Sequence, residues 1–159
     1  MRGYVDMSNA LLVFLVSMSP VVELRGAIPL GIAKGMNLGQ LLFFCLLGNL
    51  IPIIPLLVLF KWGVGRLEKV RIVGDLLHWW FGRVKKKSKV VETYGFWGLV
   101  LFVSIPFPGT GAWTGSVAAT LFNFRLPKAF LAISLGVFIA GIFVTLASLG
   151  VVKAWFLFG

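Results

Sequence analysis

Residues 20–26, PVVELRG, interrupt an otherwise apolar segment that runs from residue 8 to residue 33. The interruption combines a proline, a carboxylate, a guanidinium and a glycine. A helix does not continue easily through such a stretch, because proline lacks a backbone donor and glycine weakens helices. Since the whole segment is long enough to cross a membrane once, we predict two half-helices joined by a polar turn near the middle of the membrane.

A second broken segment covers residues 94–122 and is interrupted by PFPGTG at residues 106–111. Each broken segment is followed by an unbroken apolar stretch, at residues 40–60 and 129–152. A helix of about twenty apolar residues covers the hydrocarbon core of a bilayer, so each stretch predicts a spanning helix. Prolines inside the first stretch, Pro52 and Pro55, are expected to kink it.

The two halves of the chain have the same order of features. Sliding the sequence against itself by 88 residues pairs Pro20 with Pro108 and Gly48 with Gly136. A broken segment, a short polar link and a span therefore recur at one spacing, which indicates an internal repeat. We place repeat one at residues 8–60 and repeat two at residues 94–152. If each broken segment turns back as a re-entrant hairpin, the repeats are inverted, as in secondary transporters.

Composition places the chain in a membrane. Of its 159 residues, 59% are hydrophobic and 13% are charged, which is outside the range of soluble proteins. We predict an all-α integral membrane protein with one membrane domain, residues 1–159, and with residues 1–20 kept in the mature chain rather than removed as a signal peptide.

The segment at residues 61–92 holds nine of the 15 Lys and Arg residues. Its apolar residues recur at helical spacing, which predicts an amphipathic helix on the cytoplasmic membrane surface, facing anionic lipids rather than nucleic acid. The alternative is a solvated loop that packs its apolar face on the protein itself.

An alternative topology has four spans, with both broken segments crossing fully. Counting basic residues on the two sides of the membrane gives 11 against three in either arrangement, so the charge rule does not choose between them. We prefer the hairpins because of the central breaks and the repeat.

Glu23 and Arg25 are the only ionisable residues predicted deep in the membrane, where such residues are costly and usually functional. In the functional interpretation Glu23 is a proton or cation site and Arg25 holds an anionic group. In the structural interpretation the two side chains neutralise each other and only shape the turn.

The second half-helices are predicted to begin at Gly26 and Ala112, so that two helix N-termini, which favour anions, point into one midplane cavity. Asn49, inside the first span, either bonds to a neighbouring helix or joins the site. The alternative for the second break is a tight turn with Thr110 as an N-cap and no ligand. The candidate substrate- or ion-binding residues are Glu23, Arg25, Gly26, Asn49, Pro108, Gly109, Thr110, Gly111, Trp113 and Thr114.

No enzyme, cofactor or metal site is predicted. The single histidine, His78, has no partner at ligand spacing, and no nucleophile, base and orienting group occur together. The single cysteine, Cys45, lies in an apolar run and is expected to serve packing.

With these residues identified, the chain resembles the small multidrug export family of bacteria and archaea. The resemblance rests on SPVVELRGAIPLGIAKG at residues 19–35, GNLIP at residues 48–52 and YGFWGLVLFVSIPFPGTGAWTGS at residues 94–116. It implies a multi-pass transporter in the cytoplasmic membrane.

The chain is more distantly similar to the DedA superfamily, whose members resemble two inverted hairpin-plus-helix units and include proteins implicated in moving lipid phosphates. In that likeness Glu23 matches an acidic position of the first hairpin. The second hairpin departs from it, because IPFPGT stands at residues 105–110 where an arginine-containing motif is expected.

Our hypothesis is a small secondary transporter or lipid flippase, coupled to protons, that moves an anionic amphiphile such as a lipid phosphate. The alternatives are a small multidrug exporter and a non-transporting membrane scaffold. The expected partners are membrane lipids, protons and a second copy of the chain, because two full crossings are too few to enclose a pathway.

Overall fold

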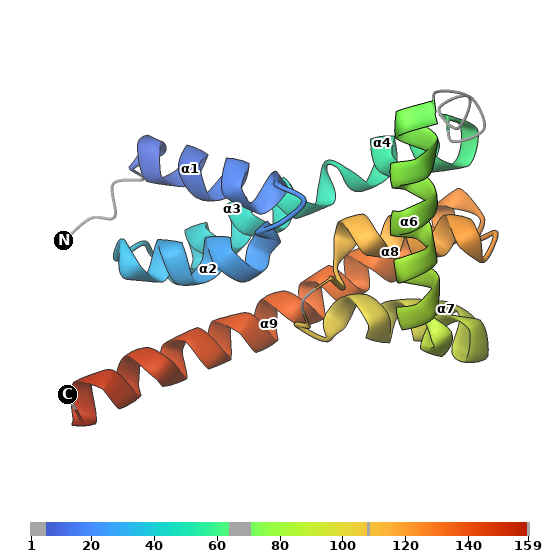
Figure 1. Cartoon of the computed structure of the whole chain (residues 1–159). Helices are drawn as coiled ribbons and strands as arrows, with labels where there is room; N and C mark the ends of the chain where they lie inside the picture. The colour runs from blue at the N-terminus through green and yellow to red at the C-terminus, as the bar shows by residue number, and fades with distance from the viewer. Residues whose placement is uncertain (1–5, 64–70, 108, 159) are drawn as a thin grey trace. The chain divides into compact units, whose positions relative to one another are not determined.

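The computed structural model describes residues 6–63, 71–107 and 109–158, and within these ranges all regular structure is helical (Figure 1). The predicted all-α fold is therefore confirmed, while the re-entrant hairpins and their inversion stay predictions. The chain forms two compact units, one from Met1–Ile51 with Phe138–Gly159 and the other from Pro52–Val137.

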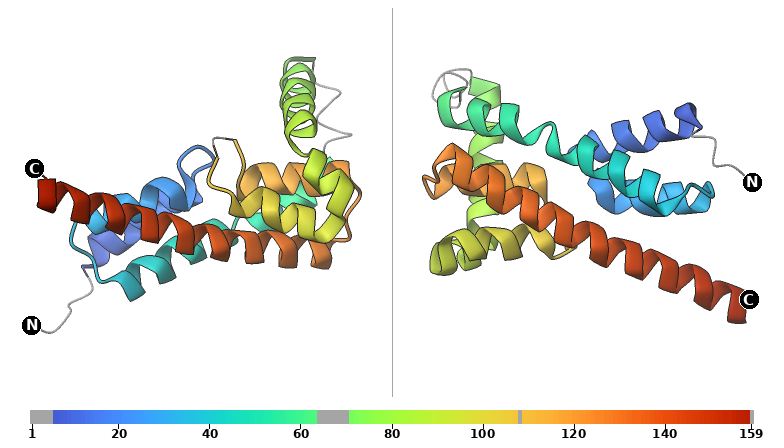
Figure 2. Two further views of the ribbon diagram at one scale, coloured as in Figure 1. Left: turned by 90° about the horizontal axis from the view of Figure 1, so that it is seen from below. Right: turned by 180° about the vertical axis from the view of Figure 1, so that it is seen from behind.

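The first unit contains a short helical pair, α1 (Met7–Met18) and α2 (Glu23–Ala33), followed by α3 (Leu38–Leu50). These three helices contact one another, and α1 and α2 lie side by side next to α3 (Figures 1 and 2). Asp6 caps α1, because its carboxylate accepts a hydrogen bond from the Ser8 N–H at 3.1 Å. The broken segment is therefore a pair of packed helices.

The break in the first segment is shorter than predicted. α2 begins at Glu23 rather than at Gly26, because the Glu23 N–H already donates to the Ser19 carbonyl and the Gly26 N–H to the Val22 carbonyl, both at 3.2 Å. Pro20 stands before these bonds, where its missing N–H costs nothing. Glu23, Arg25 and Gly26 thus lie in the first turn of a helix and not in a loop.

The second unit holds the other broken segment. Its helices are α4 (Ile53–Val58), the π-helix η1 (Leu59–Gly63), α6 (Arg71–Lys87), α7 (Lys89–Ser104), α8 (Ala112–Leu121) and the start of α9 (Leu126–Phe158). α7 kinks at Gly95, whose φ is +53°. The predicted interruption at residues 106–111 is confirmed, with α8 beginning at Ala112 as expected.

Within the described residues, two helices are long and apolar enough to cross a membrane, Leu38–Trp62 and Leu126–Val151. The first contains the predicted span at residues 40–60, and the second covers the predicted span at residues 129–152 except for its last residue. The first is kinked as expected: α3 ends at Leu50, and α4 starts directly after Pro52, which cannot donate to the preceding turn.

The two halves repeat the same helix ends. α2 and α8 both finish with a residue of positive φ, Gly35 at +70° and Asn123 at +53°, 88 positions apart. The following helices, α3 and α9, start at residues that are again 88 apart. The capping bonds run from Gly35 and Met36 to Ile32 and Gly31, and from Asn123 and Phe124 to Thr120 and Ala119, at 2.9 to 3.1 Å. Both ends have the Schellman bonding pattern.

The long helices also meet their neighbours through matching glycines. A Cβ atom at Gly48 of α3 would collide with the Phe14 carbonyl oxygen and would lie 3.1 Å from the Ser17 Cβ. A Cβ atom at Gly136 of α9 would lie 2.9 Å from a carbonyl oxygen of α7 and 2.7 Å from the Cβ of Val103. In both halves a glycine lets the broken pair's first helix approach closely.

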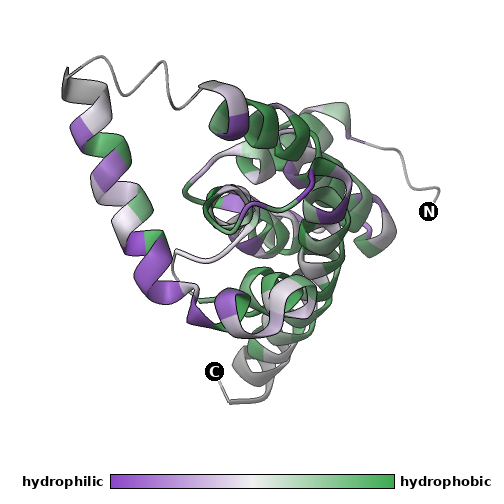
Figure 3. Ribbon diagram, turned by 90° about the vertical axis from the view of Figure 1, so that its right-hand side faces the viewer, coloured by the Kyte–Doolittle hydropathy of each residue, from purple (hydrophilic) through white to green (hydrophobic). Residues whose placement is uncertain are grey.

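Exposed apolar side chains follow each long helix at intervals of three or four residues. They are Phe43, Leu47, Ile51, Ile54 and Val58 on the first span and Leu131, Leu135, Phe138, Ile142 and Leu146 on α9. Lipid satisfies such stripes, whereas water does not. Along α6, by contrast, hydrophilic residues recur between hydrophobic ones (Figure 3).

Candidate functional site

The first break centres on Glu23, a buried carboxylate in an unusual backbone conformation. Its side chain is 5% exposed and its φ is +52°. A left-handed conformation costs a residue with a side chain roughly 1–2 kcal/mol, and such strain occurs most often at functional sites. Glu23 is therefore the strongest single candidate in this part of the chain.

Arg25 and Gly26 follow Glu23 in the first turn of α2. Glu23 acts electrostatically on the half-buried Arg25, so the structure brings the predicted pair together. Gly26 has a packing reason of its own, because a Cβ atom there would collide with the Val22 side chain. The two opposite charges of the pair cancel, and the net charge changes when a proton or an anion binds.

Asn49 lies in α3, and its side chain is buried at 1% exposure. Neither atom of its amide makes a hydrogen bond within the described residues, contrary to the expectation of a bond to a neighbouring helix. A buried amide without a partner costs about 1–3 kcal/mol. A binding role for Asn49 stays a prediction.

The second break is a turn closed by Thr110. Its hydroxyl lies 2.8 Å from the Ile105 carbonyl and 2.9 Å from the Phe107 carbonyl, and can donate to either. Thr110 is therefore not the N-cap of α8, which is Gly111 with φ +149°. The hydroxyl stabilises the turn, so the tight turn of the alternative is present although its N-cap is wrong. Pro108 lies outside the described residues.

The remaining candidates of this break are Gly109, Trp113 and Thr114. Trp113 and Thr114 are half-buried in the first turn of α8. The Thr114 hydroxyl makes one long contact of 3.4 Å to the Gly111 carbonyl, and Gly109 has φ +81°. Gly109 and Thr114 line a cavity of about 310 Å³, which gives this break a space for a ligand.

The same cavity is lined by Trp79, Trp80, Arg83, Val84 and Lys87 of α6. Sequence reasoning missed these residues as members of the site, because neither interpretation of the basic segment, a helix on the membrane surface or a loop packed on the protein, placed it at the second break. The available signal was the spacing of Trp79, Arg83 and Lys87, which are four residues apart and thus share one helix face.

α6 packs on the protein, as the alternative for this segment proposed. Trp80 and Phe60 of η1 meet edge to face with ring centroids 5.6 Å apart, and Val84 is 3% exposed. Leu76 and Trp79 nevertheless remain largely exposed, so α6 also presents apolar area outward.

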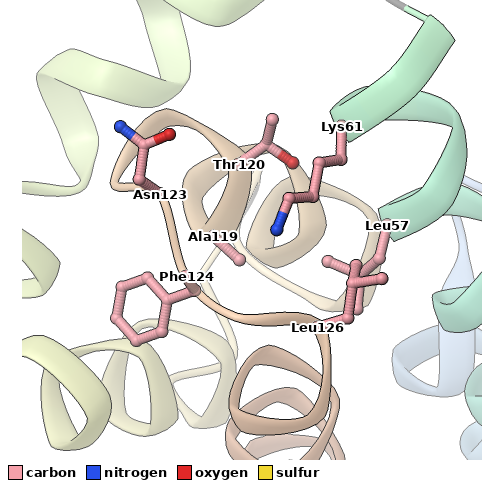
Figure 4. Close-up of a pocket in the computed structure, with 7 residues that line it drawn as sticks. All are labelled: Leu57, Lys61, Ala119, Thr120, Asn123, Phe124 and Leu126. Atoms are coloured by element: carbon pink, nitrogen blue, oxygen red, sulfur yellow. The ribbon is translucent and has the colours of Figure 1, made fainter.

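A smaller cavity of about 80 Å³ lies between η1 and the end of α8 (Figure 4). The Lys61 ammonium points into it, close to the C-terminal turn of α8, where a cation is favourable. This cavity holds a few waters at most and is too small for an amphiphile.

The two breaks belong to different units, so a midplane cavity shared by both stays a prediction. Within the described ranges, no group of three or more His, Cys, Asp and Glu side chains could hold a metal ion.

A model of the family described as "Putative small multi-drug export protein" matches residues 23–143, which is most of the chain. No curated protein and no solved structure matches the chain. The likeness to the DedA superfamily stays a prediction. The family match and the two long apolar helices indicate a membrane protein with a transporter-like role.

Proposed function

The chain belongs to the small multi-drug export family, and from this premise we propose that it is a secondary transporter that couples proton movement to the export of an amphiphile. The observation that carries the proposal is Glu23, a carboxylate that is 5% exposed inside an apolar helical pair. Ionisable groups in such places mark ion and proton pathways in transporters.

The local chemistry around Glu23 supports a coupling role. A buried carboxyl beside a guanidinium can exchange its proton when a second anion approaches Arg25, because the two negative groups compete for one positive charge. Binding of an anionic substrate and uptake of a proton by Glu23 are then linked in one turn of α2.

The helix lengths support an inverted, re-entrant architecture in the cytoplasmic membrane. α1, α2 and α8 have 12, 11 and 10 residues. At about 1.5 Å per residue each measures roughly 15–18 Å, which is about half of a hydrocarbon core of about 30 Å. Packing of α1 against α2 and of α7 against α8, with matching caps, fits two hairpins that each return to their own side.

Two cargo classes each have an observation in their favour. The family description favours drugs. Arg83 and Lys87, which line a cavity together with Gly109, favour an anionic amphiphile such as a lipid phosphate. We therefore propose that an anionic amphiphile is the main cargo, carried by a homodimer, with drug export as the alternative.

Transport in proteoliposomes under an imposed pH gradient tests the coupling role. We expect Glu23→Gln to reduce pH-driven transport of a lipid phosphate to the level of protein-free liposomes, and Glu23→Asp to keep part of it. Glu92→Gln is the matched control, because Glu92 is an exposed carboxylate in the first turn of α7. A cationic drug is assayed in parallel.

Unchanged transport and pH dependence in Glu23→Gln would show that Glu23 is not the coupling group. If Glu23→Gln combined with Arg25→Gln left the cellular phenotype and the fold intact, the non-transporting scaffold would be the better interpretation.

A further inference from the structure

The face of α6 that meets the second break carries two cations and two aromatic rings. The cavity there is lined by Trp79, Trp80, Arg83, Lys87, Gly109 and Thr114, and none of the described residues that line it is acidic. A site with paired cations and no carboxylate selects an anion. The cavity of about 310 Å³ has room for a phosphate group with its substituent.

The positions of Arg83 and Lys87 suit the binding of a phosphate group. The Arg83 guanidinium carbon lies 4.7 Å from the centroid of the Trp79 ring, which restricts the guanidinium to a stacked position. The Lys87 ammonium lies 3.1 Å from the point where a Cβ of Gly109 would stand, so the loop brings its backbone directly beside this charge. Guanidinium and ammonium together match the oxygens of a phosphate.

Lys87 also lines a second cavity. It measures about 350 Å³ and is lined by Lys87, Val90, Phe102, Ile105, Phe107 and Thr110. Its lining is mainly apolar, and the Ile105 and Phe107 side chains are 53% and 64% exposed. An anion site and an apolar site therefore adjoin at one lysine.

We infer that α6 and the α7–α8 loop together bind a phosphate-bearing amphiphile. Its phosphate lies between Arg83 and Lys87 against the Trp79 ring, and its hydrocarbon chain covers Ile105 and Phe107. The view that this ligand is cargo rests on the proposed function, whereas the binding site does not.

Binding is measured by titration calorimetry on the purified full chain in a zwitterionic detergent, with dioctanoyl phosphatidate as the probe. We expect Arg83→Gln combined with Lys87→Gln to weaken binding by roughly tenfold or more. Lys85→Gln combined with Lys86→Gln is the matched control, since it removes the same charge from exposed positions of α6 outside both cavities. This control should stay within about twofold of the unmodified chain.

Two further arms separate a lipid headgroup from free phosphate. Phe107→Ala should weaken phosphatidate binding and leave the binding of inorganic phosphate unchanged, because it removes only apolar contact. Dioctanoyl phosphatidylcholine should bind more weakly than phosphatidate, because its headgroup has no net charge.

Absence of phosphatidate binding, or an equal loss in both double variants, would overturn the inference. Inorganic phosphate binding as tightly as phosphatidate would overturn the assignment of the apolar cavity to the chain. Failure of coupling is read from pH-driven transport by Glu23→Gln, and failure of this site from phosphatidate binding by Arg83→Gln combined with Lys87→Gln, so the two failures give different results.

Discussion

At the scale of single residues, Gly35 and Asn123 adopt the same kind of backbone conformation although their side chains differ. Both residues end a short helix with positive φ. Glycine adopts this conformation without steric cost, and asparagine is the residue that tolerates it next best. The match supports the repeat more strongly than sequence identity does, because it concerns backbone geometry.

We therefore expect Asn123→Gly to raise the free energy of unfolding by up to about 1 kcal/mol, because it removes a side chain from a left-handed residue. Gly35→Asn should lower it by a similar amount. Both are measured as shifts of the melting temperature of the protein in detergent. A lower melting temperature for Asn123→Gly would mean that the exposed Asn123 side chain stabilises the turn.

The sequence allowed part of the candidate site to be predicted at this scale. Glu23 and Arg25 were recognisable because charges in an apolar segment are conspicuous. The positive φ of Glu23 was not, because glutamate has no preference for that conformation. Arg83 and Lys87 were missed because periodicity shows which residues share a face but not what that face contacts.

At the scale of elements, the long apolar helices were predictable and the short ones were less so. Uninterrupted apolar runs fix the two spans within a few residues. The start of α2 was wrong by three residues, because Ser19 and Val22 provide helical acceptors ahead of Gly26. Those bonds depend on the path of the turn, which residue types alone do not specify.

The two glycine contacts make a prediction about helix packing. Gly48→Ala and Gly136→Ala should each lower the free energy of unfolding by about 1–3 kcal/mol, because each adds a methyl group against backbone or Cβ atoms of the neighbouring helix. Gly82→Ala in α6 is the control, since nothing lies within 4 Å of its would-be Cβ and alanine favours helix.

These stabilities can be compared by thermal unfolding of each variant in the same detergent. Equal melting temperatures for Gly48→Ala, Gly136→Ala and the unmodified chain would show that the helices separate easily at these points. A loss in one half alone would show that the two contacts are not equivalent.

At the scale of the whole molecule, the two predicted topologies differ in the side of the membrane that each repeat faces. Lys34 and Lys128 are both exposed; Lys34 follows the last residue of α2, and Lys128 lies in the first turn of α9. Inverted hairpins place them on opposite sides, with Lys34 outside. The four-span arrangement places both outside.

Single cysteines at these positions decide the matter. In a Cys45→Ser background, we expect Lys34→Cys to react with an impermeant maleimide added to intact cells. Lys128→Cys should react only after the membrane is opened. Labelling of both variants in intact cells would support the four-span arrangement and remove the basis for inverted repeats.

The order of helices along the chain has a consequence for biosynthesis. In each half, the short pair leaves the ribosome before the long helix that follows it. A pair of half-length helices with a polar turn cannot settle in lipid alone, because its backbone groups at the break would lack partners. If the pairs are re-entrant, α1 and α2 therefore wait for α3, and α7 and α8 wait for α9. In that topology each half is completed in the membrane from its C-terminal end, opposite to the direction in which it is made.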